Sequence, residues 1–402
     1  MEFNIVYFAF VGQNFGGVEQ KIISQFDALL KLTPKTDLYL VSSLPSNDVF
    51  ASEIDKRSNV KVLINTPGRI NNPWKRRKEK FQLISKALEA YDPEITIVYL
   101  RYPMADFLLL NFLKFNKRYK IITEHQQIEN TSSGLKFNGN YLNNILETIF
   151  GRSVRKRIHA FVGVTSEITD YQINKSGDLN KMSATIGNGI NVEKYPVRTL
   201  NHSEPEIIKI LFVGSGFGTH GLDRVIKGMA DYVASGENKR IIYLRIAGDS
   251  HEMHRNRELV KKIKISKFVE FLGNQNNAQL NEHFNWADVC VGSLGLHRIG
   301  LNYSSTLKAR EYASRGIPFF WSTLDEDFGD DFKYIYHVES DDSDVNLNDI
   351  TSFALNVRSD FEHPRNMKCF ALNNLTWDIK MKKLFQFFES AIKKNEATNL
   401  YT

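Results

Sequence analysis

The sequence contains only two cysteines among its 402 residues, Cys290 and Cys369, and it has no long hydrophobic run. Two cysteines do not build a disulfide framework, which favours a reducing cytoplasm as the location. No apolar stretch approaches the ~20 residues of a membrane-spanning helix. The apolar run Ile5–Val11 has the length of a strand and no basic segment precedes it, so we expect no signal peptide. Zinc-type ligand spacings and a nucleophile elbow are also missing, and we expect no bound metal.

The chain has room for two domains of about 150–200 residues each. In both halves, strand-like apolar runs alternate with amphipathic helical stretches. This alternation predicts parallel sheets with helices on both faces. The polar segment Asn201–Glu206 indicates a linker, and the final amphipathic helix Trp377–Lys393 adds no strand and could pack back across the domain junction. The predicted fold class is α/β, with two Rossmann-like domains facing a cleft. The predicted division is residues 1–200, residues 201–376, and a C-terminal helix and tail at 377–402.

One stretch near the C-terminal end, residues 289–320, combines a strand, a loop and a helix. Val289–Leu294 is a short apolar run, and a glycine-punctuated loop follows it. Thr306 precedes a good helix-forming run, on which Lys308 and Glu311 stand three residues apart and share a face. A helix start at the carboxyl end of a buried strand favours an anion, and a carboxylate can accept hydrogen bonds from two neighbouring hydroxyls. Phosphate and diol are the groups that a nucleotide presents.

In each half of the sequence, a glycine-rich loop follows the first predicted strand. The first is Gly12–Glu19, in which Gly16 and Gly17 precede a helix; the alternative to a ligand site is a tight turn. The second is Gly214–Gly221, which satisfies the G-x-G-x-x-G pattern of dinucleotide-binding loops. The nearest acid at a following strand end, Asp249, comes late for that fingerprint. A nicotinamide-dependent oxidoreductase therefore stands as an alternative.

Three further groups of residues are candidates for chemistry. His125 and the pair Arg101-Tyr102 lie at predicted strand ends, where they either face the cleft or serve the structure. The acidic runs Asp325–Asp331 and Glu339–Asp344 could hold a metal with a diphosphate, but their Asp- and Ser-rich composition favours solvated turns.

The positive charge is concentrated in the first half of the sequence. Three basic clusters have aromatic neighbours: Trp74–Lys78, Lys114–Lys120 and Arg152–Arg157. Solvated helix faces would explain them, and so would docking on an anionic membrane surface. Nucleic acid is not expected as a partner, because no aromatic-basic module pattern is present.

Seven motifs in register resemble those of retaining GT-B glycosyltransferases of the large family 4, and together they cover most of the chain. They are Gly16–Glu19, Asn188–Asn191, Phe212–Gly214, Leu244–Gly248, Val269–Gly273, Trp286–Val289 and Leu307–Pro318. The resemblance implies that Glu311 binds the donor ribose and that the backbone at Thr306 and Leu307 holds the diphosphate. It also implies that Gly16 and Gly17 approach the phosphate or the acceptor and that His125 faces the transferred sugar. Independently of the resemblance, the glycine-rich loop with Gly214, Ser215 and His220 is expected to contact phosphate whichever nucleotide binds.

The sequence departs from the family pattern at several positions. Ser215 and His220 stand where the family carries a basic pair, and His297 stands where it carries a carboxylate. Arg298 and Lys308 are the candidates to replace the missing positive charge. Helix dipoles and basic side chains would stabilise the leaving diphosphate, so the family needs neither metal nor cofactor.

The predicted function is transfer of a sugar from a nucleoside-diphosphate donor to a saccharide or lipid-linked acceptor, with retention, in the synthesis of cell-surface polysaccharide or glycoconjugate. The protein would be cytoplasmic, at the inner face of the cell membrane if the acceptor is a lipid. The departures motivate a second hypothesis, a non-catalytic GT-B homologue that binds or stabilises a partner.

Overall fold

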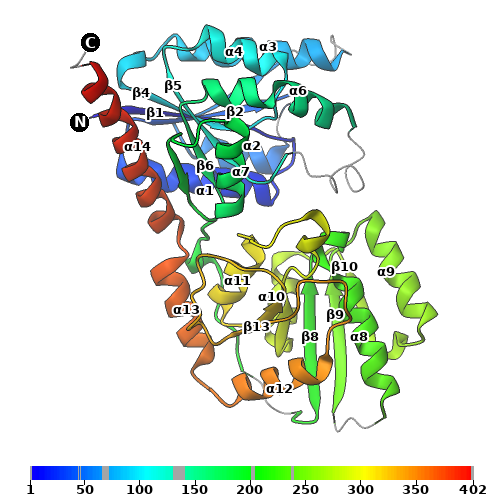
Figure 1. The fold of residues 1–402 in the computed structure, drawn as a ribbon. Coiled ribbons are helices and arrows are strands. Elements are labelled where there is room, and N and C mark those ends of the chain that lie inside the picture. The colour runs from blue at the N-terminus through cyan, green and yellow to red at the C-terminus, as the bar shows by residue number, and fades with distance from the viewer. Residues whose placement is uncertain are drawn as a thin grey trace. The chain divides into compact units, whose positions relative to one another are not determined.

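The computed structural model describes residues 2–43, 45, 47–65, 72–129, 141–200, 204–236 and 240–399. The chain forms two compact units (Figure 1). Unit 1 comprises Met1–Gly187 together with Trp377–Thr402, and unit 2 comprises Asn188–Thr376. The division thus falls before Asn188, earlier than the expected boundary after residue 200. The start of the expected linker Asn201–Glu206 lies outside the described residues.

Unit 1 is built on a parallel sheet with the strand order β3-β2-β1-β4-β5-β6-β7. The central strands are buried on both faces, as expected for long Val-, Ile- and Leu-rich runs in a parallel sheet. Its strands are β1 (Asn4–Phe10), β2 (Thr36–Ser42), β3 (Val60–Ile64), β4 (Thr96–Arg101), β5 (Lys120–His125), β6 (Ala160–Gly163) and β7 (Ser183–Thr185).

The helices of unit 1 cover its sheet. Side chains of α3, α4 and α6 share one hydrophobic cluster with side chains of β1, β2, β4 and β5, so these three helices pack on the same face of the sheet. The helix α14 returns to this unit and packs against α1 (Figure 1). The helices are α1 (Gly17–Leu32), α2 (Asp48–Asp55), α3 (Pro73–Leu88), α4 (Phe107–Phe115), α6 (Tyr141–Arg157), α7 (Ser166–Ser176) and α14 (Trp377–Asn399).

Unit 2 is a second parallel sheet with the order β10-β9-β8-β11-β12-β13. Helices α8, α9 and α12 cover one face, and α10, α11 and α13 cover the other. Its strands are β8 (Ile207–Val213), β9 (Ile241–Ala247), β10 (Val269–Gly273), β11 (Val289–Val291), β12 (Phe319–Trp321) and β13 (Ile335–His337). Its helices are α8 (Leu222–Ala234), α9 (His251–Lys262), α10 (Asn277–Trp286), α11 (Leu307–Arg315), α12 (Leu347–Arg358) and α13 (His363–Asn374).

The predicted α/β class with two Rossmann-like sheets is confirmed, and the C-terminal helix does pack on the first unit. The sequence reading missed several short or weakly patterned elements: β7, β13, α2, α12 and α13. It also extended the strand β11 to Leu294, whereas the strand ends at Val291 and the loop begins there. Within the described part of the chain, no helix combines the length and the apolar character that a membrane crossing requires.

The return of α14 to unit 1 is secured by aromatic side chains. The ring of Phe388 lies 5.3 Å from that of Tyr99 in an edge-on arrangement, and Phe385 stacks on Phe3 at 5.3 Å. Phe388 is fully buried. The helix is therefore a part of the first core although it comes last in the sequence.

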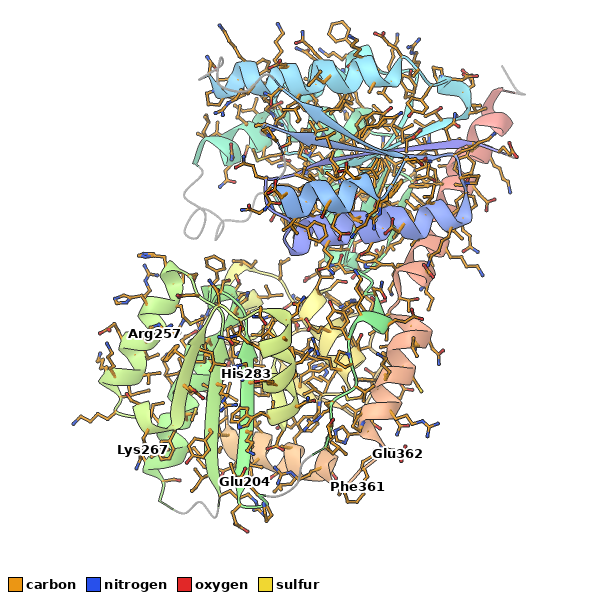
Figure 2. All side chains as sticks on the ribbon, turned by 180° about the vertical axis from the view of Figure 1, so that it is seen from behind. Glu204, Arg257, Lys267, His283, Phe361 and Glu362 are labelled. Carbon is orange, nitrogen blue, oxygen red and sulfur yellow. The ribbon has the colours of Figure 1, made fainter. Side chains whose placement is uncertain are left out.

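We expect Phe388→Ala to lower the free energy of unfolding by about 3 to 5 kcal/mol, because it leaves a cavity against Tyr99. Urea unfolding measures the change. The control is Phe361→Ala, since Phe361 is 69% exposed in unit 2 (Figure 2) and should cost less than about 0.5 kcal/mol. Equal losses in both variants would contradict the packing of α14 described above.

Candidate functional site

The strand order of unit 2 places a switch point between β8 and β11. From β8 the chain moves outward through β9 to β10, then returns to β11 on the other side of β8. The loops that leave the carboxyl ends of β8 and β11 therefore diverge, and ligands of open α/β sheets bind at such a point. These two loops are residues 214–221 and 292–306. They carry six of the predicted site residues: Gly214, Ser215, His220, His297, Arg298 and Thr306.

The glycines of the first loop serve its geometry. Gly214, Gly216 and Gly221 have positive φ angles of 153°, 71° and 64°. The loop also packs tightly on the second one: a Cβ atom on Gly221 would lie 2.6 Å from the Cβ of Leu294. The N–H of Leu294 donates to the His220 carbonyl oxygen at 3.2 Å. Gly216 and Gly221, two of the three glycines of the G-x-G-x-x-G pattern, thus have an explanation in turn geometry and loop packing that requires no dinucleotide.

His220 is a neutral hydrogen-bonding group in this loop. Burial, with a smaller contribution from nearby Lys308, lowers its pKa to about 3. Its Nδ1 accepts a hydrogen bond from the N–H of Gly216 at 3.2 Å, so the proton of the neutral ring is on Nε2. His220 therefore cannot supply a positive charge, but its Nε2–H can donate to a ligand oxygen. Next to it, the carbonyl of Ser215 accepts from the hydroxyl of Ser250.

Lys308 lies in the first turn of α11 and is buried without a hydrogen-bond partner. Its Nζ is among the unsatisfied buried atoms of the described residues and lies 5.2 Å from the ring centroid of Phe212. Burial lowers its pKa to about 8. Leaving a buried ammonium unpaired is costly, and such a group in a folded protein calls for an explanation. An anion bound at this helix start would provide its missing partner.

The start of α11 adds backbone donors to this cation. Thr306 caps the helix, and its hydroxyl accepts from the N–H of Ala309 at 3.4 Å. The N–H groups of Leu307 and Lys308 belong to the first turn, where an α-helix has no internal acceptors for them. The partial positive charge of the helix start and the ammonium of Lys308 therefore favour the same kind of ligand.

Glu311 follows one turn later, and its carboxylate is held in place. Its Oε1 accepts from Nε of Arg315 at 2.8 Å, and Arg315 also donates to the side-chain oxygen of Asn281 at 2.7 Å. The Glu311 side chain is 23% exposed. Burial raises its pKa above the usual value, and Arg315 opposes that shift. Glu311 thus offers an oriented carboxylate next to the start of α11.

A buried ion pair fixes the loop that leads into α11. Arg310 is fully buried and bonds both carboxylate oxygens of Asp325, at 2.5 and 3.0 Å. It also donates to the carbonyl oxygens of Asn188 at 2.7 Å and Thr306 at 3.2 Å. The sequence reading of Asp325–Asp331 as a solvated turn was wrong at Asp325, which is 6% exposed. An arginine that pairs with an acid from a distant loop leaves no signal in local sequence.

The other two candidates of the second loop are already paired. Arg298 makes a two-pronged contact with Asp223, at 2.9 and 2.8 Å, and a further bond to Asp342 at 2.7 Å. His297 lies against the same Asp342 oxygen at 3.2 Å. The sequence analysis named Arg298 as a replacement cation for the diphosphate; in the structure its charge is used by these carboxylates instead. Lys308 is the candidate cation that keeps an unpaired charge.

The glycine loop of unit 1 closes on its own helix. The carboxylate of Glu19 accepts from the N–H groups of Gly12 at 3.3 Å and Gly16 at 3.1 Å. Gly16 is the N-cap of α1 in an extended conformation. A Cβ atom on Gly17 would meet no other atom within 4 Å. The protein itself therefore does not require glycine at position 17, which is compatible with a ligand that approaches the backbone there.

His125 is enclosed in unit 1, which is the structural one of the two roles that its strand-end position left open; the family resemblance implied instead that it faces the transferred sugar. The ring is fully buried, with Nε2 2.8 Å from the Thr123 hydroxyl and Nδ1 2.9 Å from Glu129. Burial lowers its pKa. Glu129 also bonds the buried Arg155 at 3.0 Å. His125 therefore belongs to a buried polar network of unit 1. Of the expected strand-end pair, Tyr102 joins the same network through Arg155 at 3.1 Å.

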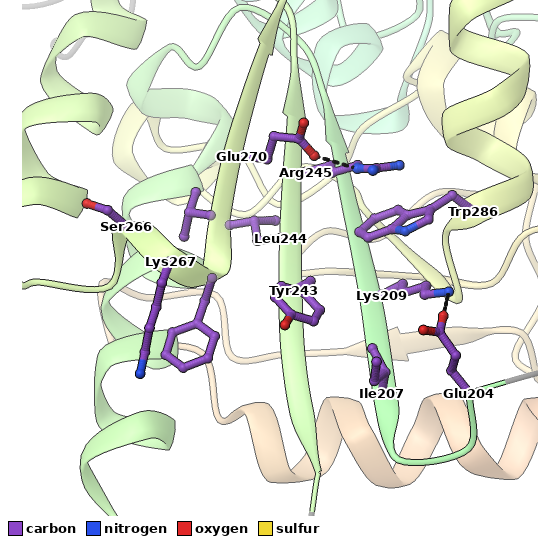
Figure 3. Close-up of a pocket in the computed structure, with 12 residues that line it drawn as sticks. Glu204, Ile207, Lys209, Tyr243, Leu244, Arg245, Ser266, Lys267, Glu270 and Trp286 are labelled. Atoms are coloured by element: carbon purple, nitrogen blue, oxygen red, sulfur yellow. Dashed lines mark hydrogen bonds and ion pairs between the residues drawn. The ribbon is translucent and has the colours of Figure 1, made fainter.

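Two pockets of unit 2 differ in their relation to this site. A pocket of about 260 Å³ lies at the carboxyl ends of β8 and β9 and is lined by Gly214, Ser215, Gly248, Asp249 and Asn274, among others. A larger one, of about 500 Å³, lies on the face of the sheet (Figure 3). There Arg245 bonds Glu270 at 2.7 Å and lies over the Trp286 ring at 4.1 Å, and Lys209 pairs with Glu204. Only the first pocket adjoins the glycine loop.

Comparisons with known proteins agree with this architecture. Residues 198–301 match the family model described as "Glycosyl transferases group 1". No curated protein matches the chain. A solved glycosyltransferase from Rickettsia africae ESF-5 is 14% identical with a TM-score of 0.68, and the match covers 98% of this chain and 99% of that one.

Two further solved structures match over nearly their whole length. Sucrose-phosphate synthase from Thermosynechococcus elongatus is 13% identical with a TM-score of 0.65, covering 98% of this chain and 100% of that one. The pneumococcal O-GlcNAc transferase GtfA, solved in complex with UDP and GlcNAc, is 10% identical with a TM-score of 0.62, covering 97% and 99%. The chain therefore has the GT-B fold, as the motifs implied, and the family match supports sugar transfer.

The buried ammonium of Lys308 gives a pH-dependent prediction. Its pKa is about 8 in the folded protein and near 10.5 when the chain is unfolded, so the unfolded state binds more protons between these values. Stability should therefore rise from pH 8 to 10.5 by up to about 3 kcal/mol from this group. Lys308→Met should be more stable than the wild type at pH 7 and should lose this rise. Urea unfolding at both pH values compares them, and an equal or lower stability of the variant at pH 7 would show that Lys308 has a partner.

Proposed function

We propose that this chain transfers a sugar from a nucleoside-diphosphate donor to a saccharide or lipid-linked acceptor, with retention of the anomeric configuration and without a metal. The observation that carries the proposal is the unpaired, buried ammonium of Lys308 at the start of α11, with the carboxylate of Glu311 one turn away. A positive group and a carboxylate at this spacing match the phosphate and the diol of a nucleotide. The family match over residues 198–301 supports the same class of reaction.

The diphosphate would occupy the start of α11. The N–H groups of Leu307 and Lys308 and the Lys308 ammonium supply the charge, and Nε2–H of His220 supplies a neutral donor. When the bond between sugar and phosphate breaks, negative charge develops on the leaving diphosphate. Fixed donors in a partly buried site stabilise that charge without reorganisation. We assign this task to the unpaired ammonium of Lys308 and to the start of α11.

The ribose of the nucleoside would lie against Glu311, and its base would lie beside the glycine loop of unit 2. A carboxylate accepts hydrogen bonds from both hydroxyls of a ribose, and Arg315 keeps that of Glu311 oriented. The pocket of about 260 Å³ borders Gly214 and Ser215, and Asn274 and Gln275 belong to its lining. Amide side chains can donate to and accept from the edge of a base. We assign this pocket to the nucleobase.

Unit 1 would contribute the acceptor side. The open space at Gly17 lets a substrate approach the start of α1, and Gly16 and Glu19 hold the loop in shape. We do not assign a catalytic role to His125, because both of its ring nitrogens are engaged within the buried network.

A second candidate function is a non-catalytic GT-B homologue that binds a partner. The observation in its favour is that Arg298 is neutralised by Asp223 and Asp342, while burial keeps His220 uncharged. Lys308 is then the one candidate side chain at the described switch-point loops that brings a positive charge to the leaving group. A chain that binds nucleotide but cannot stabilise the transition state would have this arrangement.

Nucleotide binding is tested by thermal shift with nucleoside diphosphates. At a concentration of 100 times Kd, ligand binding adds about 2.7 kcal/mol and should raise Tm by about 5 to 10 °C. Glu311→Gln keeps the contact with Arg315 but loses the charge, so the affinity should fall roughly 10- to 100-fold. The matched control is Glu362→Gln, an exposed acid of unit 2 (Figure 2), which should bind like the wild type. A shift with NAD and none with any nucleoside diphosphate would favour the oxidoreductase reading.

Turnover separates the two proposals that share nucleotide binding. For a transferase, we expect hydrolysis or transfer from the donor that binds best, and Lys308→Met should lower kcat by at least roughly 100-fold through loss of charge stabilisation. Release of nucleoside diphosphate is the measurement, made with the wild type, Lys308→Met and Lys262→Met as a surface control. Tight binding with no release above background, on water or on any saccharide or lipid-linked acceptor offered, would identify the non-catalytic homologue.

A further inference from the structure

The outer surface of α3, α4 and α6 in unit 1 is not used by the proposed function. The inner sides of these helices pack together on one face of the sheet. A chain of rings joins them near one end: Trp74 of α3 lies 5.4 Å from Phe107 of α4, which lies 6.4 Å from Phe150 of α6. The three helices therefore present one continuous layer (Figure 1). We call its solvent side the α3-α4-α6 surface.

This surface carries a dense cluster of positive charge. Helix α3 alone has six lysine and arginine side chains and one glutamate, against a net charge of +6 for the whole chain. Lys75, Arg76, Lys78 and Lys86 are exposed, and none of them has a carboxylate partner among the described residues. Burial and the neighbouring Arg77 and Arg76 lower the pKa of Lys80. The cations of α3 are close enough to repel one another, and in the described part of the chain Arg77, on Asp106, is the one that pairs with a carboxylate.

The same surface exposes large hydrophobic side chains. Phe107 and Phe115 of α4 are 41% and 85% exposed. On α6, Leu142, Ile145 and Ile149 are 54%, 44% and 62% exposed and recur at helical spacing. The stripe continues with the exposed cations Arg152 and Lys156. Single exposed hydrophobics are common, but five on two adjoining helices indicate an interaction site.

Between α3 and α4 the surface is hollowed into a groove of about 560 Å³. Phe81, Leu108 and Phe112 contribute apolar lining, and Lys78 and Lys86 belong to the same lining. Cations next to hydrocarbon are the combination that binds an anionic lipid. The lipid phosphate contacts the cations, and the acyl chain contacts the hydrocarbon.

We propose that the α3-α4-α6 surface docks on an anionic lipid bilayer. A solvated helix face would not expose Phe115 and Ile149, and a nucleic-acid site would not need this amount of aliphatic surface. An acidic protein partner could pair with the cations, but a bilayer also accepts flat, unshaped hydrocarbon such as the α6 stripe. Each lysine or arginine near a negatively charged membrane strengthens binding, and inserted aromatic rings add to that.

The experiment is co-sedimentation of the full chain with vesicles of phosphatidylcholine alone and of phosphatidylcholine mixed with phosphatidylglycerol. We expect association with the anionic vesicles, little with the neutral ones, and weakening as salt is raised. The triple variant Lys75→Glu, Arg76→Glu, Lys78→Glu should bind at least roughly 100-fold more weakly. Phe115→Asp should weaken binding roughly tenfold.

Matched controls come from unit 2. The triple variant Arg255→Glu, Lys262→Glu, Lys267→Glu makes the same change of charge at exposed positions, and Phe361→Asp replaces a ring that is 69% exposed (Figure 2). Both should bind vesicles like the wild type. Equal weakening in test and control variants, equal binding to neutral vesicles, or stronger binding to polyglutamate or RNA than to anionic vesicles would overturn the proposal. Because no nucleotide or acceptor is present, the outcome is independent of the proposed transferase activity.

Discussion

The ion pair between Arg310 and Asp325 is the interaction on which the candidate site depends. It joins the helix α11 to the loop after β12, and the same guanidinium bonds the carbonyls of Asn188 and Thr306. Three segments that are distant in the sequence thereby meet at one helix start. Removing one member of a buried ion pair leaves an uncompensated charge and costs several kcal/mol. The position of the anion-binding turn is thus tied to the stability of unit 2.

Two cations of unit 2 show that pairing with carboxylates decides whether a positive side chain is available to bind an anionic ligand. Arg298 and Lys308 lie ten residues apart in the sequence and are both candidates for a diphosphate. Asp223 and Asp342 neutralise Arg298, whereas Lys308 is packed against the ring of Phe212 with no acceptor in the described structure. A paired charge is already stabilised, and a ligand must first displace its partners. The unpaired one gains by binding an anion, which is why the proposed function rests on Lys308.

The two surfaces of functional interest lie in different units and use charge in different ways. At α11 a single cation is desolvated next to backbone donors, which suits one localised anion. On the α3-α4-α6 surface many exposed cations lie beside hydrocarbon, which suits an extended anionic surface rather than one ligand. Glu311 and the glycine loop give the site at α11 a defined shape. The α3-α4-α6 surface needs no defined shape to meet an extended anionic surface.

The sequence by itself determined the alternation of strands and helices, the glycine turns and the start of α11, because these follow from local periodicity and capping. It therefore predicted the parallel sheets and the neighbourhood of Thr306, Lys308 and Glu311. Tertiary structure alone decided that Asp325 is buried with Arg310, that Arg298 is neutralised and that His125 is enclosed. Each of these depends on which distant side chain lies opposite, and no local pattern encodes that partner. The short elements β7 and β13 were missed for the same reason, since pairing with a neighbouring strand creates them.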